Sequence, residues 1–295
     1  MVFFRQSRLL SASSSRWGVE SAPPEEIGSE EASDRLVLTR GVRSDGQTLR
    51  WYKETGVKQI TRPSGTRWQV LLDNRVLTSP AGGRLNAPSE SMAQAIAFEW
   101  GAQEKYIKPF TLPIMALLAT SIDQVPKTRH FIVGNLLNCF NTDTVCLRVA
   151  RAQNSVLHAL QAAEHQPVVD WFQGLFQIPV DVFDSGEMGL VAQTRQQEQS
   201  ITTLQWYLHN CSDLMLTGLD VMVASLKSTI LAIAVSEGRL TAHQALALSR
   251  LEEDLQIRQW GECEGDHDLD KAELKVRMTT ASAFLKMIPN NRRIL

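Results

Sequence analysis

The sequence has few cysteines and no closely spaced pair of them. Four cysteines are spread over 295 residues, at positions 139, 146, 211 and 263. Zinc ribbons and thioredoxin-like redox centres need a CxxC motif, so both are excluded. A sparse, unclustered set is typical of a reducing compartment, where each cysteine serves as a small apolar side chain.

A surplus of positive charge and the common catalytic motifs are also missing. The chain has 30 Lys and Arg against 32 Asp and Glu, a formal net charge of −2. Nucleic-acid-binding proteins usually concentrate basic residues in a patch, so no nucleic-acid partner is expected. No GxxxxGK[ST], GxGxxG, GxSxG or HExxH occurs, which removes the local signatures of nucleotide binding, serine hydrolysis and zinc proteolysis.

Long apolar runs are nearly absent. The one candidate membrane span, residues 214–235, is interrupted by Asp220 and Lys227. Each charge is costly at bilayer depth, so the segment predicts a buried core helix over 213–236 and no membrane span. Lys227 in such a helix would be a natural ion partner for a carboxylate that faces inward.

The N-terminal segment differs in composition from the rest. Residues 1–19 contain Arg5, Arg8 and Arg16, a serine cluster and no acid. This is the composition of a mitochondrial transit peptide, with a disordered basic tail as the alternative. The following segment is rich in Pro, Glu, Ser and Gly, so residues 1–48 are interpreted as transit peptide and disordered linker.

The first folded region alternates apolar and polar residues as strands do. Such alternation, with turn residues between the runs, predicts a small antiparallel sheet. From Pro88 the period becomes helical, with Ser89 as N-cap, and it places Trp100 in a core with Glu99 on the adjoining face. The expected strands are 50–60, 66–72 and 75–78, and the expected helices are 88–100, 114–122 and 128–140.

The remainder is nearly all helical, apart from a short extended piece at 178–183. The fold class is therefore α+β, with a small antiparallel β domain before a larger all-α domain. The β-rich domain with its connecting helices is expected over 49–145 and the α-helical domain over 146–295. The expected helices of the second domain are 154–164, 167–176, 192–212, 213–236, 241–260 and 269–287.

The most informative stretch is 241–261, which reads as one helix with both ends marked. Thr241 and Gln244 have the spacing of a capping box, and Gly261 can end the helix. At about 100° per residue the apolar side chains share one face, with Glu252 inside or at the edge of it. The apolar positions are Ala245, Leu248, Leu251 and Leu255.

A carboxylate at that position needs a partner or an open surface. One reading pairs Glu252 with a Lys or Arg of a neighbouring helix, and Lys227 within about 6 Å is the specific prediction. The other reading holds Glu252 for a second protein chain. In both readings Arg250 lies on a side of the helix that water can reach.

An acidic cluster follows this helix, and Asp143 stands alone between two other elements. The cluster can be read as a loop that caps the last helix through Asp268 or Asp270, as a metal site, or as a partner-binding rim. Asp143 is expected to cap or turn the chain. The cluster comprises Glu262, Cys263, Glu264, Asp266, His267, Asp268 and Asp270.

An ordered set of short motifs resembles the ATP12 family, assembly chaperones of the mitochondrial F1-ATPase. The likeness runs from about residue 50 to 285, and its most specific part is the block SRLEE…Q…QWG at 249–261. The other matching motifs are LD at 72–73, LTSP at 77–80, EW at 99–100, NTDT at 141–144, LKS at 226–228 and HD at 267–268.

The resemblance implies a binding protein of the mitochondrial matrix. Members bind the unassembled α subunit of F1 until it pairs with β; they are not enzymes, carry no cofactor and use no small-molecule substrate. The family's sensitive acidic position falls in the block 250–253, and its Glu-Trp motif falls on 99–100. The partner-binding candidates are Glu252, Glu253, Asp268 and Trp260, and the structural or functional ones are Trp100, Glu99, Asp143 and Lys227.

Two rival functions stay open from the residues themselves. The first is a metal-assisted hydrolase that uses a cluster of acids and one histidine. The second is a permanent subunit of a larger assembly. The residues of the hydrolase reading are Glu252, Glu253, His267 and Asp268.

Overall fold

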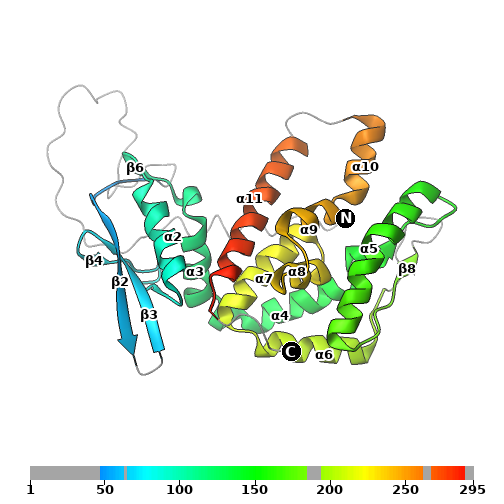
Figure 1. The fold of residues 1–295 in the computed structure, drawn as a ribbon, viewed down its shortest axis with the longest axis horizontal. Helices are drawn as coiled ribbons and strands as arrows, with labels where there is room; N and C mark the ends of the chain where they lie inside the picture. The colour runs from blue at the N-terminus through cyan, green and yellow to red at the C-terminus, as the bar shows by residue number, and fades with distance from the viewer. Residues whose placement is uncertain (1–46, 63–64, 185–193, 262–266, 290–295) are drawn as a thin grey trace. The chain divides into compact units, whose positions relative to one another are not determined.

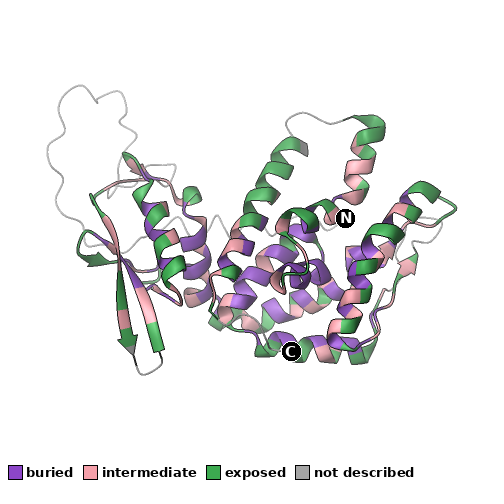
Figure 2. Cartoon of the chain, in the orientation of Figure 1, coloured by how far each residue is buried: buried purple, intermediate pink, exposed green. Residues whose placement is uncertain are grey.

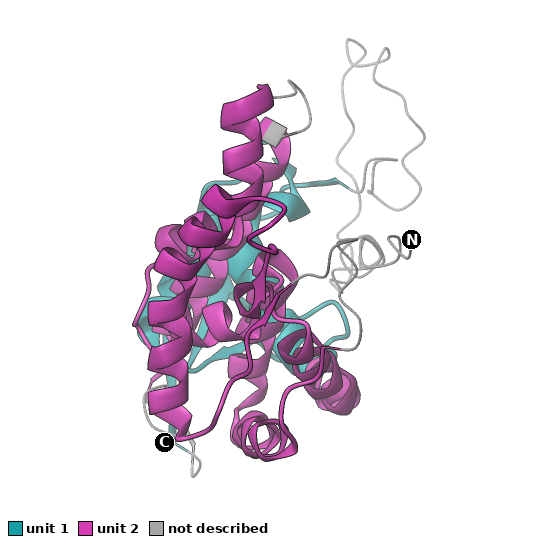
Figure 3. Cartoon of the chain, turned by 90° about the vertical axis from the view of Figure 1, so that its right-hand side faces the viewer, with its two compact units in different colours: residues 1–124 teal, residues 125–295 magenta. Residues whose placement is uncertain are grey.

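The structure is a computed structural model that describes residues 47–62, 65–184, 194–261 and 267–289 (Figure 1). The chain divides into two compact units, residues 1–124 and 125–295 (Figure 3). The expected boundary was residue 145. The units separate earlier because the helix that begins at Val125 packs on helices of the second unit. The predicted α+β class is confirmed.

The first unit is built on an antiparallel sheet, as predicted. Strand β3 is central and pairs with β2 along their whole length, with Val57 opposite Val70. Val70 and Leu72 are buried on the face toward α2, because alternate residues of a strand share a face. The strands of this sheet are β2 (Thr55–Arg62), β3 (Gly65–Leu72), β4 (Arg75–Val76) and β5 (Asn86–Ala87), while β1 (Thr48–Leu49) and β6 (Tyr106–Ile107) form a separate antiparallel pair.

Helix α2 (Glu90–Gly101) covers this sheet. The hydroxyl of Ser89 accepts a hydrogen bond from the amide of Met92 at 3.2 Å, so the predicted N-cap is confirmed. Trp100 is buried as expected, and its carbonyl accepts a hydrogen bond from the Tyr52 hydroxyl at 2.7 Å. The short helix η2 (Pro109–Thr111) and α3 (Pro113–Asp123) complete the unit.

The second unit is a helical bundle around α8, whose residues 229–235 are all buried (Figure 2). A short parallel pair of strands lies beside it. Its elements are α4 (Val125–Asn141), η3 (Thr144–Cys146), β7 (Leu147–Arg148), α5 (Ser155–Phe176), β8 (Phe183–Asp184), α6 (Glu198–Asn210), α7 (Asp213–Leu226), α8 (Thr229–Ser236), α9 (Ala242–Ser249), α10 (Leu251–Trp260) and α11 (His267–Lys286).

Two helix predictions before residue 241 were wrong in their continuity. The helix expected over 213–236 is two helices, because Lys227 adopts a left-handed conformation (φ 53°) and Ser228 caps α8. The helices expected over 154–164 and 167–176 are one, α5, which continues through Pro167. A proline inside a helix removes one backbone hydrogen bond. Packing of the buried residues on both sides of Pro167 compensates for that loss. In the part of the chain that the structure describes, no helix is long and apolar enough to cross a membrane.

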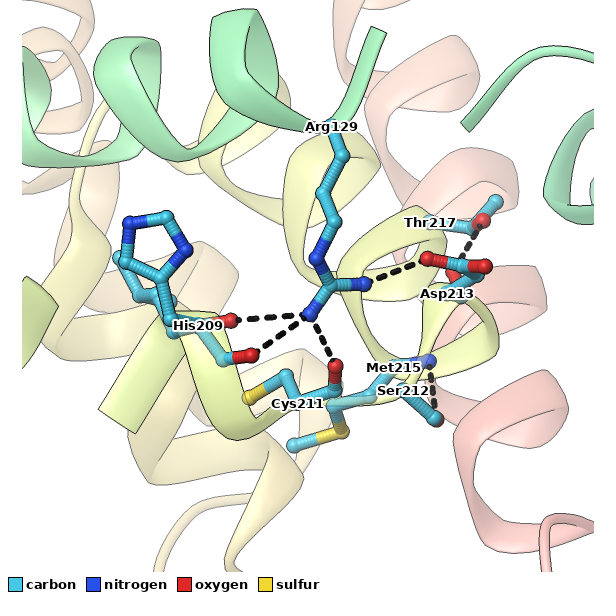
Figure 4. A network of polar contacts seen from close by, with 8 residues as sticks. Arg129, His209, Cys211, Ser212, Asp213, Met215 and Thr217 are labelled. Atoms are coloured by element: carbon cyan, nitrogen blue, oxygen red, sulfur yellow. Dashed lines mark hydrogen bonds and ion pairs between the residues drawn. The ribbon is translucent and has the colours of Figure 1, made fainter. Parts of the chain in front are cut away.

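Arg129 of α4 ties together the turn between α6 and α7 (Figure 4). Its guanidinium donates to the Asp213 carboxylate at 2.5 Å and to the carbonyl of His209 at 2.9 Å, and it also contacts the carbonyl of Cys211. These carbonyls lie at the end of α6, where four backbone acceptors lack helical partners. The Arg129 guanidinium therefore binds groups at both the C-terminal end of α6 and the N-terminal end of α7.

A close helix contact in this bundle gives a stability prediction. A methyl group added at Gly218 of α7 would lie 2.5 Å from Leu285 Cδ2 of α11, whereas one added at Gly134 of α4 meets nothing within 4 Å. We expect Gly218→Ala to lower the free energy of unfolding by about 1–3 kcal/mol through overpacking. Gly134→Ala should instead raise it by up to about 1 kcal/mol. Chemical denaturation measures the free energy of unfolding of both variants. Equal effects of the two substitutions would contradict the close contact between Gly218 and Leu285.

Candidate functional site

Arg250 marks a break in the stretch that was predicted to be one helix. The capping box of Thr241 and Gln244 is confirmed, with Thr241 Oγ1 accepting from the Gln244 amide at 3.2 Å. However, α9 ends at Ser249 and α10 starts at Leu251. Arg250 stands between them with backbone angles (φ −101°, ψ 11°) outside the helical range.

A histidine from α5 explains the position of this break. His165 Nε2 lies 3.0 Å from the carbonyl oxygen of Leu248, and Arg148 lies 3.3 Å from Nδ1. Because a guanidinium can only donate, Nδ1 accepts and Nε2 donates. In a continuous helix the Leu248 carbonyl would serve the amide four residues later. Burial lowers the pKa of His165 to about 4, so the ring stays neutral near neutral pH.

The Arg250 side chain is only 4% exposed and lies among carboxylates of two helices. Its Nη2 donates to Glu253 Oε1 at 2.7 Å and its Nη1 donates to Asp270 Oδ2 at 2.9 Å. Asp254 Oδ1 lies 3.9 Å from Nε, and Nε itself has no hydrogen bond. The expectation that Arg250 faces water was wrong, because the break turns the side chain inward. We call Arg250, Glu253, Asp254 and Asp270 the Arg250 cluster.

Glu252 lies outside this cluster. It is exposed, and its Oε1 accepts a hydrogen bond from Gln256 at 3.4 Å. Its predicted place in an apolar stripe was wrong, because that stripe required one continuous helix; none of the residues of α10 is buried. The predicted ion pair with Lys227 is absent from the described part of the chain. Lys227 is exposed, and its carbonyl accepts from the Thr144 hydroxyl at 3.2 Å.

The other partner-binding candidates lie on the same two helices. Trp260 ends α10 and is 77% exposed, and Asp268 is exposed in the first turn of α11. From Asp268 to Arg277 all residues of α11 are exposed except the half-buried Leu274 (Figure 2). Residues 262–266 and the side chain of His267 lie outside the described residues. Among the residues that are described, no group of three or more His, Cys, Asp or Glu could hold a metal ion.

Glu99 and Trp100 belong to the first unit, where both support the fold. The two carboxylate oxygens of Glu99 accept from the amides of Ile114 at 2.7 Å and Met115 at 3.0 Å. They cap α3, whose own N-cap residue, Leu112, has no side-chain acceptor. Burial outweighs these hydrogen bonds and raises the pKa of Glu99 to about 7.

Asp143 caps two elements of the second unit at once, as the capping prediction required. Its carboxylate is fully buried and accepts from the amides of Val145 at 3.2 Å and Ile230 at 3.0 Å. These amides start η3 and α8, so the side chain joins two segments far apart in sequence. Burial raises the pKa of Asp143 to about 6.

Sequence reasoning missed Arg250 and His165 as site residues. For Arg250 a signal was available, because Glu253 and Asp254 follow it by three and four residues, the spacing of helical ion pairs. For His165 no local signal exists, because its acceptor lies 83 residues later.

The raised pKa of Glu99 predicts a pH dependence of stability. Between about pH 4.5 and pH 7 the folded chain keeps the Glu99 proton and the unfolded chain loses it. The contribution of Glu99 to the free energy of unfolding therefore falls as pH rises through that window. Replacing Glu99 with Gln should remove this part of the pH dependence. The exposed Glu90→Gln variant is the control, and the free energy of unfolding measured from pH 4 to 8 should differ between the two variants. Parallel curves for both would show that Glu99 has an ordinary pKa.

The Arg250 cluster gives a second stability prediction. Replacing Arg250 with Met leaves three carboxylates close together with no cation, which should lower the free energy of unfolding by about 1–3 kcal/mol. Acid should relieve part of that loss because it protonates the carboxylates. Arg258→Met, at an exposed arginine of α10, is the control. A loss no larger than that of the control would mean that the cluster contributes nothing to stability.

Comparison with known proteins identifies relatives over most of the chain. The family model described as ATP12 chaperone protein matches residues 49–173. The mitochondrial Atp12 protein of Schizosaccharomyces pombe is 26% identical over 226 residues, which cover 74% of this chain and 77% of the relative. The mitochondrial Atp12 protein of Saccharomyces cerevisiae is 25% identical over 253 residues, which cover 72% and 77%.

Solved structures extend the likeness to the fold. The crystal structure of Atp12 from Paracoccus denitrificans matches with a TM-score of 0.73 and 27% identity, covering 81% of this chain and 98% of the other. A protein from Agrobacterium tumefaciens, described as a candidate chaperone, matches with the same TM-score and identity over 82% and 87%. The chain is therefore similar to ATP12 chaperones in sequence, most clearly over residues 49–173, and in fold.

Proposed function

We propose that this protein is an assembly chaperone of the mitochondrial matrix. It binds the unassembled α subunit of the F1-ATPase and prevents its aggregation until the α subunit pairs with β. Similarity to a chaperone family supports this proposal, and so do the mitochondrial names of the two fungal relatives. Three parts of the proposal rest on the sequence motifs and composition described above. They are the α subunit as the bound protein, the matrix as the location, and the arginine-rich N-terminus as a transit peptide.

The observation that carries the proposal is the exposed surface of α10 and the first half of α11. Trp260, Leu269 and Val276 are 77%, 64% and 61% exposed on these two helices. Exposed large apolar side chains are typical of protein-binding surfaces, and Trp is enriched at their energetic centres. An unassembled subunit exposes the apolar interface that its true partner will cover. A surface of the kind seen here can cover such an interface for a time.

Acidic side chains of both helices lie near these apolar positions, with basic ones among them. We assign to Glu252, Glu253 and Asp268 the role of meeting basic groups of the α subunit, with Trp260 as the apolar anchor. Charged groups at the edge of an interface mainly steer the encounter and select the partner. The remaining candidates stabilise the fold of the unit in which each lies, through the caps, core packing and backbone bond described above. They are Glu99 and Trp100 in the first unit and Asp143 and Lys227 in the second.

Rescue of the α subunit tests the function. The α subunit expressed alone should aggregate, and it should become soluble when this chain is present. Size-exclusion chromatography should show a complex with the α subunit that disappears when β is added. An α subunit that stays insoluble would refute the proposal, and a complex that persists with β would indicate a permanent subunit. Metal analysis of the purified chain tests the hydrolase alternative, which requires a stoichiometric metal.

Reversing the charge at Glu252 tests the assigned contact. Glu252→Lys places a cation where a basic group of the partner is expected, so the affinity for the α subunit should fall at least about tenfold, or about 1.4 kcal/mol. Folding should be unaffected, because Glu252 is exposed and its one hydrogen bond is to Gln256. The exposed Glu198→Lys of α6 is the control. Unchanged rescue by Glu252→Lys, with normal circular dichroism, would rule out this contact.

A further inference from the structure

One side of α10 combines charge and apolar surface. Glu253, Ile257 and Trp260 follow the helical spacing i, i+4, i+7, which places them on the same side. The Glu253 carboxylate is bound to Arg250, and Arg250 is bound to Asp270 of α11. This side of α10 is therefore the one directed toward α11. Ile257 is half-buried and Trp260 is exposed.

In the described part of the chain, α11 does not pack extensively against α10. Helix α10 packs mainly on α5 and α9, whereas α11 packs on α7, α8 and α9. The two helices are joined near the base of α10 by the Arg250 cluster and run separately beyond it (Figure 1). Ile257 and Trp260 consequently lie nearer the C-terminal end of α10 than the Arg250 cluster, and they keep apolar surface in contact with water.

The Arg250 cluster is electrostatically incomplete. Three carboxylates surround one guanidinium, which leaves an excess of two negative charges. Asp254 makes no hydrogen bond to the guanidinium, because its nearest oxygen is 3.9 Å from Arg250 Nε, so its carboxylate remains available to a ligand. The side chains of Glu253, Asp254 and Asp270 are 36%, 32% and 55% exposed, so a ligand can reach their carboxylates. A second cation bound to the free carboxylate oxygens would balance the cluster.

We propose that the Arg250 cluster together with Ile257 and Trp260 binds a segment of the client protein that carries an arginine or lysine next to a large apolar side chain. This inference rests on the proposed chaperone function and specifies its partner chemistry. The client's cation binds the free oxygens of Glu253, Asp254 and Asp270, and its apolar side chain packs on Ile257 and Trp260. Arg250 is a positioning residue, because it holds the carboxylates without contacting the client.

The charge of the cluster selects among ligands. Acidic segments and nucleic acid are repelled by the excess negative charge. Arginine should bind more tightly than lysine, because its planar guanidinium can bind a carboxylate through two parallel hydrogen bonds. The apolar neighbour is required as well, because an exposed ion pair alone contributes only about 0–1 kcal/mol.

Peptide binding to the intact chain tests the inference without the α subunit. The probes are fluorescein-labelled peptides of alternating Leu and Arg, of Leu and Lys, of Ala and Arg, and of Leu and Glu, followed by fluorescence anisotropy. The Leu/Arg peptide should bind most tightly, and replacing Leu by Ala or Arg by Glu should weaken binding at least about tenfold. Equal binding of Leu/Arg and Leu/Glu peptides, or of Leu/Arg and Ala/Arg peptides, would overturn the inference.

Variants locate the binding to this surface. Trp260→Ala and Asp270→Asn should each weaken the Leu/Arg peptide at least about tenfold, and only Asp270→Asn should also reduce the dependence of binding on salt. Trp206→Ala removes a 58% exposed tryptophan from α6 and should change nothing. Because Asp270→Asn could disturb the helices, its circular dichroism is compared with that of Trp260→Ala, which leaves the cluster intact.

The outcomes separate the two proposals. Tight peptide binding that Trp260→Ala does not change would overturn the inference and leave the chaperone function untouched. Failure of the wild-type chain to keep the α subunit soluble, together with surface-specific binding of the Leu/Arg peptide, would refute the α subunit as client. The surface would then serve another client of the same chemistry.

Discussion

The buried guanidinium of Arg250 is the interaction on which the exposed surface of the second unit depends. It ends one helix, starts the next and binds carboxylates from both α10 and α11. A buried cation is costly unless it is paired, so Arg250 requires carboxylates of both α10 and α11 beside it. For that reason α10 can leave its own apolar side chains in contact with water and still keep a fixed direction.

Capping carboxylates have a comparable role at the other joints of the fold. Glu99 caps α3 from the neighbouring helix, and Asp143 caps η3 and α8 together. The acidic positions that resemble the family motifs therefore divide into two groups. Glu99 is half-buried and Asp143 is buried, and both bind backbone amides, whereas Glu252 and Asp268 are exposed and are the ones that we propose to contact a partner.

Local chemistry was predictable from the sequence and long-range contacts were not. Alternation predicted the β2–β3 hairpin, Ser89 and Thr241 predicted two N-caps, and helical period placed Trp100 in the core. The break at Arg250 could not be predicted, because His165 reaches the Leu248 carbonyl from a distant helix. Once that break was missed, Glu252 was placed in an apolar stripe and Arg250 in water, and both placements were wrong.

The most direct test is hydrogen–deuterium exchange of the chain alone and in complex with the α subunit. We expect the amides of α10 and of the first half of α11 to exchange slowly in the complex and faster in the free chain, while the buried amides of α8 change little. Protection that appears elsewhere, with 251–260 and 268–277 unchanged, would contradict the claim that the Arg250 cluster holds the client-binding surface.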